Sequence, residues 1–553
     1  MTGRELIGQV LKKHGFVKEG AIQEALAEQR KHGGLLGTHL VNLGHVDARQ
    51  LAVALADQAG LQHVDLTSFE PDDAAVEALD ASTAHAFTVL PLSLTGDVLE
   101  VAIADPLNTV LLDDLRFSTG REVRGRLGDA ELIKKWIDTC YGEEESLKDV
   151  IAQAAREAGQ ENPEDAASSA PVVRLLNSIL HRAIRDRASD VHFEVFANEL
   201  RIRYRVDGSL YEIEAPPAHL APALLARIKV MSDLDVAETK LPQDGRIALV
   251  IDGRPVDLRV ATLPGVAGEG AVLRVLDRST VSLDLDALGL EPRDADSLRE
   301  LCALPHGIVL VTGPTGSGKT TTLYAMLSEI NDPETKIITV EDPVEYDIEG
   351  LVQVPINEEI GVGYAKVLRT VLRQDPDKIL VGEIRDPDTA STAVEASLTG
   401  HTVFATVHTN DAPSAVTRLI DMGIEPFLIT ATLEAVVAQR LVRCVCEDCR
   451  ATFEPDEELL RELGEEGERL RGASLSYGRG CDSCFHTGYR GRTALHEIMV
   501  LDRGMREAVS QRSATAELRR LAVSAGMRTL RQAGIDRVLA GRTTIDEILR
   551  ETM

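Results

Sequence analysis

The chain has 553 residues, enough for three or four domains at roughly 150 residues each. Its 59 Lys and Arg residues against 89 Asp and Glu residues give a net charge of −30, which argues against attraction of the whole surface to nucleic acid or anionic lipid. Only 3% of residues are aromatic, so aliphatic side chains should fill the cores and base-stacking platforms are not expected. No apolar run reaches transmembrane length, and the N-terminus lacks a signal-peptide pattern, so we expect a cytoplasmic protein.

Residues 1–60 contain an internal repeat, in which Gly8 corresponds to Gly37 and Gly15 to Gly44 at one constant offset. In each copy apolar residues recur at helical spacing on both sides of a glycine turn, so each copy is predicted to form two short helices. Neither copy alone would bury its apolar face. We expect a helical docking module, with a ligand site repeated twice as the alternative.

Residues 61–145 are predicted to form a small α/β domain, with a strand at Val98–Ile103. Asp105-Pro106 breaks this strand, and the pattern beyond it is read as helical up to Tyr141. Residues 146–169 are small, polar and acidic in composition, which is typical of a flexible linker.

Residues 170–285 are predicted to form an α+β domain without a catalytic motif of its own. A helix is expected to begin at Pro171 because proline suits the first turn. Two alternating strands follow at 191–196 and 200–206, and Asp207-Gly208 supplies a hairpin turn. The later expected elements are a helix at 224–231 and hairpins at Gly245-Arg246 and Asp252-Gly253.

The last domain, 286–553, alternates short β-branched runs with helical segments. Such runs are typical of a buried parallel sheet with helices on both faces, which is an α/β fold. The four expected strands are 308–311, 337–340, 379–381 and 403–406.

A complete G-x-x-x-x-G-K-T loop follows the first of these strands and precedes a helix. In such a loop the backbone N–H groups surround phosphate oxygens, and the helix N-terminus adds a favourable dipole. We expect Lys319 to reach the β- and γ-phosphates of ATP and the Thr320 hydroxyl to hold Mg²⁺. The loop residues are Gly313, Pro314, Thr315, Gly316, Ser317, Gly318, Lys319 and Thr320.

Hydrolysis also needs a carboxylate that orients water. Glu341-Asp342 and Glu383 each follow a predicted strand, and the carboxyl ends of strands in such sheets face the ligand crevice. We favour Glu341 for the water and Glu383 for the metal, although the sequence does not settle which acid does which. His408 lies two residues past the fourth strand and is a candidate sensor of the γ-phosphate, with a structural role as the alternative.

The loop 313–320 and the segments that carry Glu341, Glu383 and His408 resemble, in that order, the Walker A, Asp-box, Walker B and His-box motifs of the type II secretion and type IV pilus assembly ATPases. The preceding domain matches that family at 188–194 and 241–246. The resemblance implies a RecA-like parallel-sheet core in a homohexamer that hydrolyses ATP. It also implies that the motor drives an inner-membrane platform protein, which adds pilin-like subunits to a filament.

The resemblance further indicates arginines that would stabilise charge at the phosphates. Arg259 and Arg274 would come from the second domain as catalytic residues. Arg369, Arg373 and Arg418 would bind the nucleotide from the ATPase core. The alternative for each is an ordinary exposed ion pair.

Two C-x-x-C pairs, Cys446/Cys449 and Cys481/Cys484, predict a closed tetrahedral Zn²⁺ site with a structural role in a subdomain at about 441–495. The pairs match an insertion of the assembly-type family members. Cys444 lies outside that pattern and is an alternative ligand. Cys140 and Cys302 stand alone and are interpreted as buried apolar residues.

The N-terminal repeat resembles a tandem cyclic di-GMP-binding module, but both copies lack the Arg that usually precedes Leu-Gly; Arg4 is a possible substitute in one copy. Docking to a membrane-anchored partner is the preferred interpretation, with peripheral attachment to the inner membrane and no nucleic-acid partner. Two other functions stay open, a nucleotide-gated scaffold and a RecA-like nucleic-acid motor.

Overall fold

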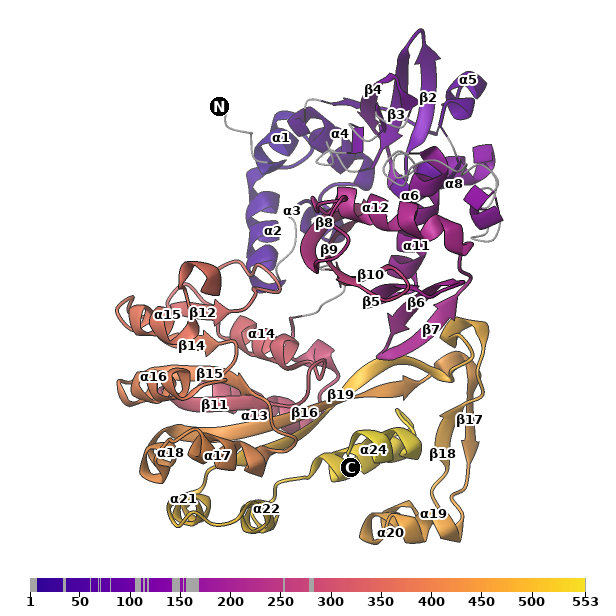
Figure 1. Cartoon of the computed structure of the whole chain (residues 1–553). Coiled ribbons are helices and arrows are strands. Elements are labelled where there is room, and N and C mark those ends of the chain that lie inside the picture. Colours follow the sequence, from indigo (N-terminus) through magenta and orange to yellow (C-terminus); the bar gives the residue numbers. More distant parts are fainter. Residues whose placement is uncertain are drawn as a thin grey trace. The chain divides into compact units, whose positions relative to one another are not determined.

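The computed structural model describes residues 7–32, 36–59, 61–67, 69, 71–79, 81–104, 111–112, 115–116, 119–141, 150–152, 154–155, 169–251, 254–277 and 283–552. The chain divides into two units, Met1–Ser279 and Thr280–Met553 (Figure 1). The predicted boundaries of the five sequence segments stay predictions, and the predicted linker falls mostly outside the described residues.

The N-terminal repeat forms two pairs of helices, as predicted. Gly15 and Gly44 end the first helix of each pair in the left-handed conformation, with φ of 75° and 72°. Their N–H groups donate to the carbonyls of Lys12 and Val41 at 3.0 and 2.9 Å, so both copies close with the same turn. The helices are α1 (Ile7–Lys13), α2 (Glu19–His32), α3 (Leu36–Asn42) and α4 (Ala48–Ala59).

A four-stranded sheet in the order β1-β4-β3-β2 follows the repeat. The strand predicted at Val98–Ile103 is present as β3, but the helical reading of the segment up to Tyr141 is wrong because β4 lies within it. In β4 the side chains of Val123 and Leu127 are buried, and a Cβ on Gly125 would lie 3.2 Å from Leu112. This inward alternation is interrupted by a glycine, which hid the strand. The elements are β1 (Gln62–His63), α5 (Asp73–Glu77), α6 (Ala81–Phe87), β2 (Leu90–Thr95), β3 (Val98–Ile103), β4 (Glu122–Leu127) and α8 (Ala130–Tyr141).

The rest of the first unit is an α+β assembly around a six-stranded antiparallel sheet, β7-β6-β5-β10-β9-β8. Helix α11 begins beside Pro171 as predicted and buries one stripe, which includes Leu175 and Ile179. The hairpin at Asp207-Gly208 is confirmed, since Val206 pairs with Ser209. The elements are α11 (Ala170–Arg185), β5 (Asp190–Val195), β6 (Leu200–Val206), β7 (Ser209–Ile213), η1 (Ala218–Leu220), α12 (Ala221–Met231), β8 (Gln243–Ile251), β9 (Arg254–Pro264) and β10 (Glu269–Asp277).

The hairpin predicted at Gly245-Arg246 is wrong, because both residues lie inside β8, where Gly245 pairs with Val260. A Cβ on Gly245 would lie 2.6 Å from the carbonyl oxygen of Ser232, so the glycine permits a close backbone approach and not a turn. The second predicted turn, Asp252-Gly253, lies outside the described residues, and the flanking Ile251 pairs with Arg254.

The second unit contains a seven-stranded sheet in the order β13-β12-β14-β15-β11-β16-β19. All neighbouring strands are parallel except β19, which runs antiparallel to β16 at one edge. The four predicted strands are present. The strands are β11 (Gly307–Thr312), β12 (Ile337–Glu341), β13 (Val352–Pro355), β14 (Lys378–Val381), β15 (Thr402–Val407), β16 (Leu433–Val445) and β19 (Tyr489–Val500).

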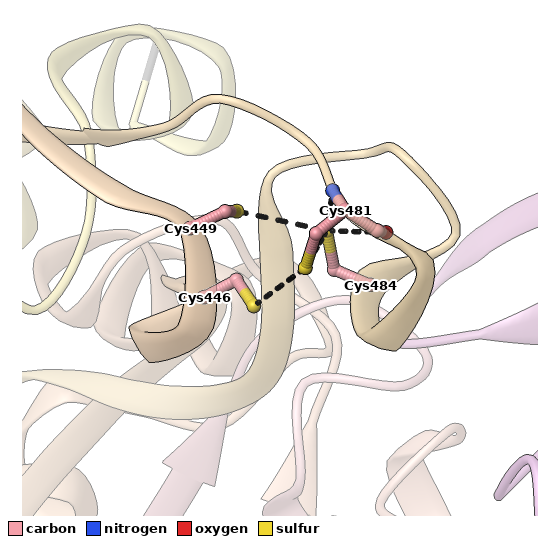
Figure 2. A group of neighbouring side chains, drawn as sticks. All are labelled: Cys446, Cys449, Cys481 and Cys484. Carbon is pink, nitrogen blue, oxygen red and sulfur yellow. Dashed lines mark hydrogen bonds between the residues drawn. The ribbon is translucent and has the colours of Figure 1, made fainter.

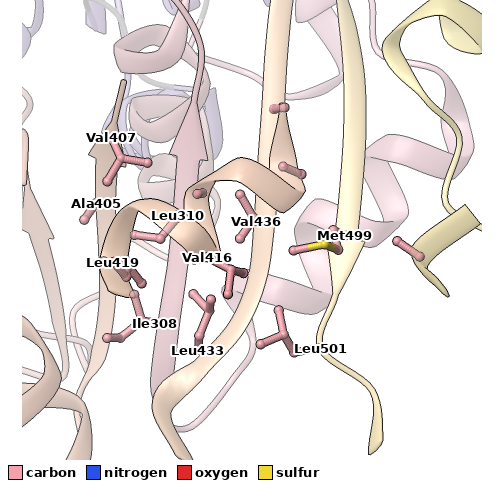
Figure 3. Close-up of a cluster of buried hydrophobic side chains, with 14 of the residues drawn as sticks. Ile308, Leu310, Ala405, Val407, Val416, Leu419, Leu433, Val436, Met499 and Leu501 are labelled. Atoms are coloured by element: carbon pink, nitrogen blue, oxygen red, sulfur yellow. The ribbon is translucent and has the colours of Figure 1, made fainter. Parts of the chain in front are cut away.

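Helices cover both faces of this sheet. Ile308 and Leu310 of β11 belong to one buried cluster, part of which Figure 3 shows, and the alternate residues Val309 and Val311 belong to another. The first cluster includes residues of α15–α18 and α21–α24, and the second includes residues of α13 and α14. The helices are η2 (Asp286–Leu288), α13 (Pro292–Cys302), α14 (Lys319–Glu329), η3 (Glu358–Ile360), α15 (Tyr364–Val371), α16 (Pro387–Leu398), α17 (Ala412–Asp421), α18 (Pro426–Thr432), α21 (Arg503–Ser510), α22 (Thr515–Ser524), α23 (Leu530–Leu539) and α24 (Ile545–Glu551).

A small insertion separates β16 from β19. Its two strands pair antiparallel, from Arg450 opposite Gly478 to Phe453 opposite Leu475. Its elements are η4 (Glu447–Cys449), β17 (Arg450–Phe453), α19 (Glu457–Glu462), α20 (Glu465–Leu470), β18 (Leu475–Gly478) and η5 (Asp482–Cys484). Within the described parts of both units, no helix combines the length and apolarity that crossing a bilayer requires.

Candidate active site and metal centre

The predicted phosphate loop joins the end of β11 to the start of α14. Gly313 and Gly318 both have positive φ, 149° and 85°, which a side chain would disfavour. The Lys319 ammonium lies over the loop and donates to the carbonyls of Gly313 and Pro314 at 2.8 and 3.1 Å. Burial lowers the pKa of Lys319, and the nearby charge of Glu383 opposes this shift.

The loop fits a chain of phosphates. The Ser317 hydroxyl is buried without a hydrogen-bond partner in the described part of the chain. The N–H groups at the start of α14 have no intrahelical acceptor, and such a helix end favours an anion. A half-buried Thr320 stands in the first turn, beside the lysine. The donors, the cation and the hydroxyl expected of a triphosphate site are therefore together.

Glu341 is almost fully buried, at 3% exposure, at the end of β12. Its carboxylate accepts hydrogen bonds from the hydroxyls of Tyr324 and Thr339 and, at 3.2 Å, from the Gln353 amide. Burial and the hydrogen bond to Glu341 both raise the pKa of Tyr324, so that phenol stays a donor. The carboxylate thus ties the helix of the phosphate loop to two strands.

Glu383 lies just beyond β14, and His408 lies just beyond the neighbouring strand β15. His408 Nε2 is 2.8 Å from one Glu383 oxygen, and an Arg385 nitrogen is 2.7 Å from the other. The ends of these two neighbouring strands are therefore joined through the Glu383 carboxylate. The acid end of β12 is close as well, because a Cβ on Gly382 would lie 3.3 Å from the Cα of Glu341.

The other His-box residues have structural contacts. His401 Nδ1 lies 2.9 Å from the Ala396 carbonyl, close to the end of α16. The Thr312 hydroxyl is 2.8 Å from both the N–H and the hydroxyl of Thr409, which fixes the segment after β15 to the end of β11.

The predicted arginines come from both units. Arg259 and Arg274 are cross-strand partners on β9 and β10 of the first unit, and Arg274 forms an ion pair with Asp190 at 3.1 Å. Arg369 on α15 and Arg418 on α17 are exposed, as is Arg373 just beyond α15. Their roles at a nucleotide stay predictions.

Sequence reasoning missed Gln439 and Arg440, which lie on β16 behind the loop. Gln439 is 2% exposed and its amide donates to the Ser317 carbonyl at 2.8 Å. Arg440 donates to the Asn410 carbonyl at 2.9 Å, and burial lowers its pKa. The segment reads as an ordinary buried strand, and two polar residues inside its apolar run were the only signal.

The four predicted zinc ligands form one cluster in which all four sulfurs lie within 4.8 Å of one another (Figure 2). The Cys446–Cys481 and Cys449–Cys484 sulfur separations are both 3.9 Å. A tetrahedron of thiolates at the usual Zn–S distance has edges of about 3.8 Å. The cluster therefore has the dimensions of a closed four-thiolate site.

Backbone N–H groups surround the sulfurs. Cys484 Sγ accepts from the amides of Cys481 and Gly488 at 3.2 and 3.3 Å. Burial opposes the thiolate, yet these amides and the neighbouring thiols lower the pKa of Cys484 to about 7. Cys444 is not in the cluster; it lies at a register shift between β16 and β19.

Burial favours the neutral thiol at both isolated cysteines. Burial raises the pKa of Cys302 to about 12 and raises that of Cys140 as well. Cys302 is fully buried, as predicted, and Cys140 is partly buried.

Comparison with known proteins gives the family. The model of the family described as "Type II/IV secretion system protein" matches residues 165–550. A second model, the MshEN domain, matches residues 59–147 and so begins where the helical repeat ends.

Two curated relatives align over almost the whole chain. The type IV pilus assembly ATPase PilB of Myxococcus xanthus is 40% identical over 100% of this chain and 99% of the relative. The type II secretion system protein E of Xanthomonas campestris pv. campestris is 41% identical over 99% of this chain and 98% of the relative. The solved structure of the Legionella pneumophila ATPase DotB has the same fold, with a TM-score of 0.51 at 22% identity, over 68% of this chain and 94% of that one. The chain belongs to the type II/IV secretion system protein family and is an ATP-hydrolysing motor of the kind found in type II secretion and type IV pilus assembly.

Proposed function

We propose that the chain works as a homohexamer whose ATP hydrolysis moves an inner-membrane platform protein, which then adds pilin-like subunits to a filament. The family match supports the motor and the machine. The main observation for the chemistry is the loop, in which the Ser317 hydroxyl has no hydrogen-bond partner among the described residues and Lys319 lies near the charge of Glu383.

In this proposal the amides of loop 313–320 and Lys319 bind the phosphates of ATP. Thr320 and Glu383 would hold Mg²⁺, which neutralises phosphate charge when bound. Glu341 would orient the attacking water. Because both of its oxygens accept hydrogen bonds, this role requires the acid to give up at least one of them, from Tyr324, Thr339 or Gln353.

His408 is proposed to position Glu383 and to sense the γ-phosphate, since its imidazole already contacts that carboxylate. Arg259 and Arg274 are proposed to reach the phosphates from the first unit of the same or a neighbouring copy. Arg369, Arg373 and Arg418 would supply further positive charge from the second unit. All three are exposed and have no ion pair in the described part of the chain, which leaves them available for a ligand or a second copy.

The four-cysteine cluster is proposed to hold Zn²⁺. Four thiolates leave no open coordination position, so the ion would stabilise the insertion between β16 and β19 and take no part in hydrolysis.

The N-terminal repeat is proposed to dock onto a membrane-anchored protein, which would place the motor at the cytoplasmic face of the inner membrane. Binding of cyclic di-GMP at this repeat is the second candidate for it. In the two copies, Leu6 and Leu35 stand two residues before Gly8 and Gly37, at the position where such modules usually have an arginine. Both leucines lie outside the described residues.

The test is Mg²⁺-dependent ATP turnover by the full chain and by Lys319→Ala. We expect turnover in the first and its loss in the second, with both proteins unfolding at the same temperature. Undiminished hydrolysis in the variant contradicts the proposed site. Stimulation by DNA would favour a nucleic-acid motor, and tight binding without turnover would favour a nucleotide-gated scaffold.

A further inference from the structure

Strand β16 continues beyond the end of its neighbour β11. Val311 pairs with Val437 and Thr312 with Ala438, and β11 then gives way to the phosphate loop. Gln439 is the next residue of β16, so it stands directly behind the loop. A Cβ on Gly313 would lie 2.4 Å from the Gln439 carbonyl oxygen, which shows how closely the two segments approach.

The side chain of Gln439 makes two hydrogen bonds of equal length inside the protein. Its Nε2 donates to the Ser317 carbonyl at 2.8 Å, and its Oε1 accepts from the Thr322 hydroxyl at 2.8 Å. A carbonyl oxygen can only accept, so the nitrogen of the amide must face Ser317. The two contacts hold the side chain between the loop and the first turn of α14.

The bond to Ser317 determines the direction of a peptide plane. In a trans peptide the C=O and the following N–H point in opposite directions. Because the Ser317 carbonyl points at Gln439, the N–H of Gly318 points away from β16, toward the side of the loop where phosphates bind. A Cβ on Gly318 would lie 2.9 Å from Gln439 Nε2, so the glutamine side chain lies close against this glycine.

We infer that Gln439 is a positioning residue for nucleotide binding, which fixes the Ser317–Gly318 peptide so that the Gly318 N–H donates to a phosphate oxygen. The inference rests on the proposed function of the loop as a phosphate site. Gln439 does not touch the nucleotide; it acts through the loop backbone. A purely structural role predicts that both of its hydrogen bonds contribute alike, to stability only.

The test compares two substitutions that each remove one side of this arrangement. Gln439→Met has similar volume and no hydrogen-bonding groups, so it releases the Ser317 carbonyl. Thr322→Val removes the other 2.8 Å hydrogen bond and leaves the bond to Ser317 in place. The full chain and each variant are titrated with Mg·ADP, and KM and kcat for ATP and the thermal unfolding midpoint are measured.

We expect Gln439→Met to raise the Kd for Mg·ADP and the KM for ATP by about tenfold or more, the loss of one charge-assisted hydrogen bond. The kcat at saturating ATP should change less than about threefold, because the contact is made equally before and during the reaction. Thr322→Val should lower the thermal unfolding midpoint about as much as Gln439→Met does, but it should change the Kd for Mg·ADP by less than about threefold.

An equal change of Kd in both variants, or an unchanged Kd in Gln439→Met, would overturn the inference. If Gln439→Met does not fold, Gln439→Asn carries the test, because its amide is one methylene too short to keep both contacts. Wild-type protein and Lys319→Ala are titrated in parallel. A wild type that binds no Mg·ADP would overturn the proposed function itself, whereas wild-type binding with no effect at Gln439 overturns the inference alone.

Discussion

The Nε2 atom of His408 lies 2.8 Å from the Oε1 atom of Glu383, and this contact joins the ends of two neighbouring strands of the sheet. Arg385 holds the second oxygen of the same carboxylate at 2.7 Å. Glu383 also acts on Lys319, since its charge opposes the lowering of the lysine pKa by burial. One carboxylate therefore connects the His-box segment with the phosphate loop.

Replacement of His408 by Ala should lower kcat for ATP at least about tenfold, because Glu383 loses the group that orients it. The Kd for Mg·ADP should change less than about threefold, since the phosphate loop keeps its donors. The measurements are steady-state turnover and nucleotide titration of the full chain. Arg385→Ala is the matched control, because Arg385 contacts the same carboxylate but its side chain is 64% exposed. This substitution should therefore lower kcat less than His408→Ala does. Equal losses in the two variants would argue against a special role of the imidazole.

The zinc ligands can be separated from the neighbouring thiol. The Cys446→Ser variant should bind no zinc, since the four-thiolate site loses one ligand. Its insertion between β16 and β19 should therefore unfold at a lower temperature than in the wild type. Cys444→Ser is the matched control, and it should retain one zinc per chain because Cys444 is outside the cluster. Metal content by atomic absorption and thermal scanning measure both effects. Loss of zinc in Cys444→Ser would show that the fifth thiol takes part.

The elements that the sequence predicted well are those in which the chemistry is local. Gly313–Thr320 and the two C-x-x-C pairs each lie within a few positions, so spacing alone identifies them. The contacts that escaped prediction join distant segments. Gln439 lies 122 positions from Ser317, and nothing in its own strand indicates the loop that it contacts. The hydrogen bonds to the Glu341 carboxylate likewise come from Tyr324 and Gln353, which belong to other elements.

Turns and strands show the same limit. Gly245-Arg246 has the composition of a turn, but Gly245 serves a close approach to Ser232, which only the packed structure reveals. In β4, Gly125 replaces an apolar residue at an inward position, so the alternation is too weak to see. Gly15 and Gly44 were recognised because the repeat shows each turn twice.

A buried ion pair in the first unit offers a third prediction. Lys229 and Glu269 lie 2.7 Å apart with side chains 1% and 7% exposed, and the second Glu269 oxygen is buried without a partner in the described part of the chain. Lys229→Met should destabilise the unit by about 3–5 kcal/mol, because it leaves a buried carboxylate uncompensated.

The control for this pair is the double variant Lys229→Met/Glu269→Leu, which removes both charges. It should be more stable than Lys229→Met alone, since an apolar pair needs no compensation. Urea unfolding of the full chain, followed at the transition of the first unit, gives the free energies. Additive losses in the double variant would mean that the two side chains do not interact.

The last prediction concerns acid stability of the second unit. Burial, together with Arg537 and Arg528, lowers the pKa of His496 to about 3, and both ring nitrogens lack a hydrogen-bond partner in the described part of the chain. In the unfolded chain a histidine takes up a proton near pH 6.5, whereas the native His496 does not. Its contribution to stability is therefore complete above pH 6.5 and is lost as the pH falls from 6.5 toward 3. By pH 5 the linkage costs about 2 kcal/mol.

His496→Phe removes this titration and keeps a ring of similar size in the same space. We expect the variant to lose about 2 kcal/mol less than the wild type between pH 7 and pH 5, measured by urea unfolding of zinc-loaded protein. The comparison at pH 7 isolates the effect of packing, because the histidine is mostly neutral there in both states. An equal loss of stability in the two proteins over this pH range would show that His496 accepts its proton in the folded protein as well, and that water or another group satisfies the buried ring.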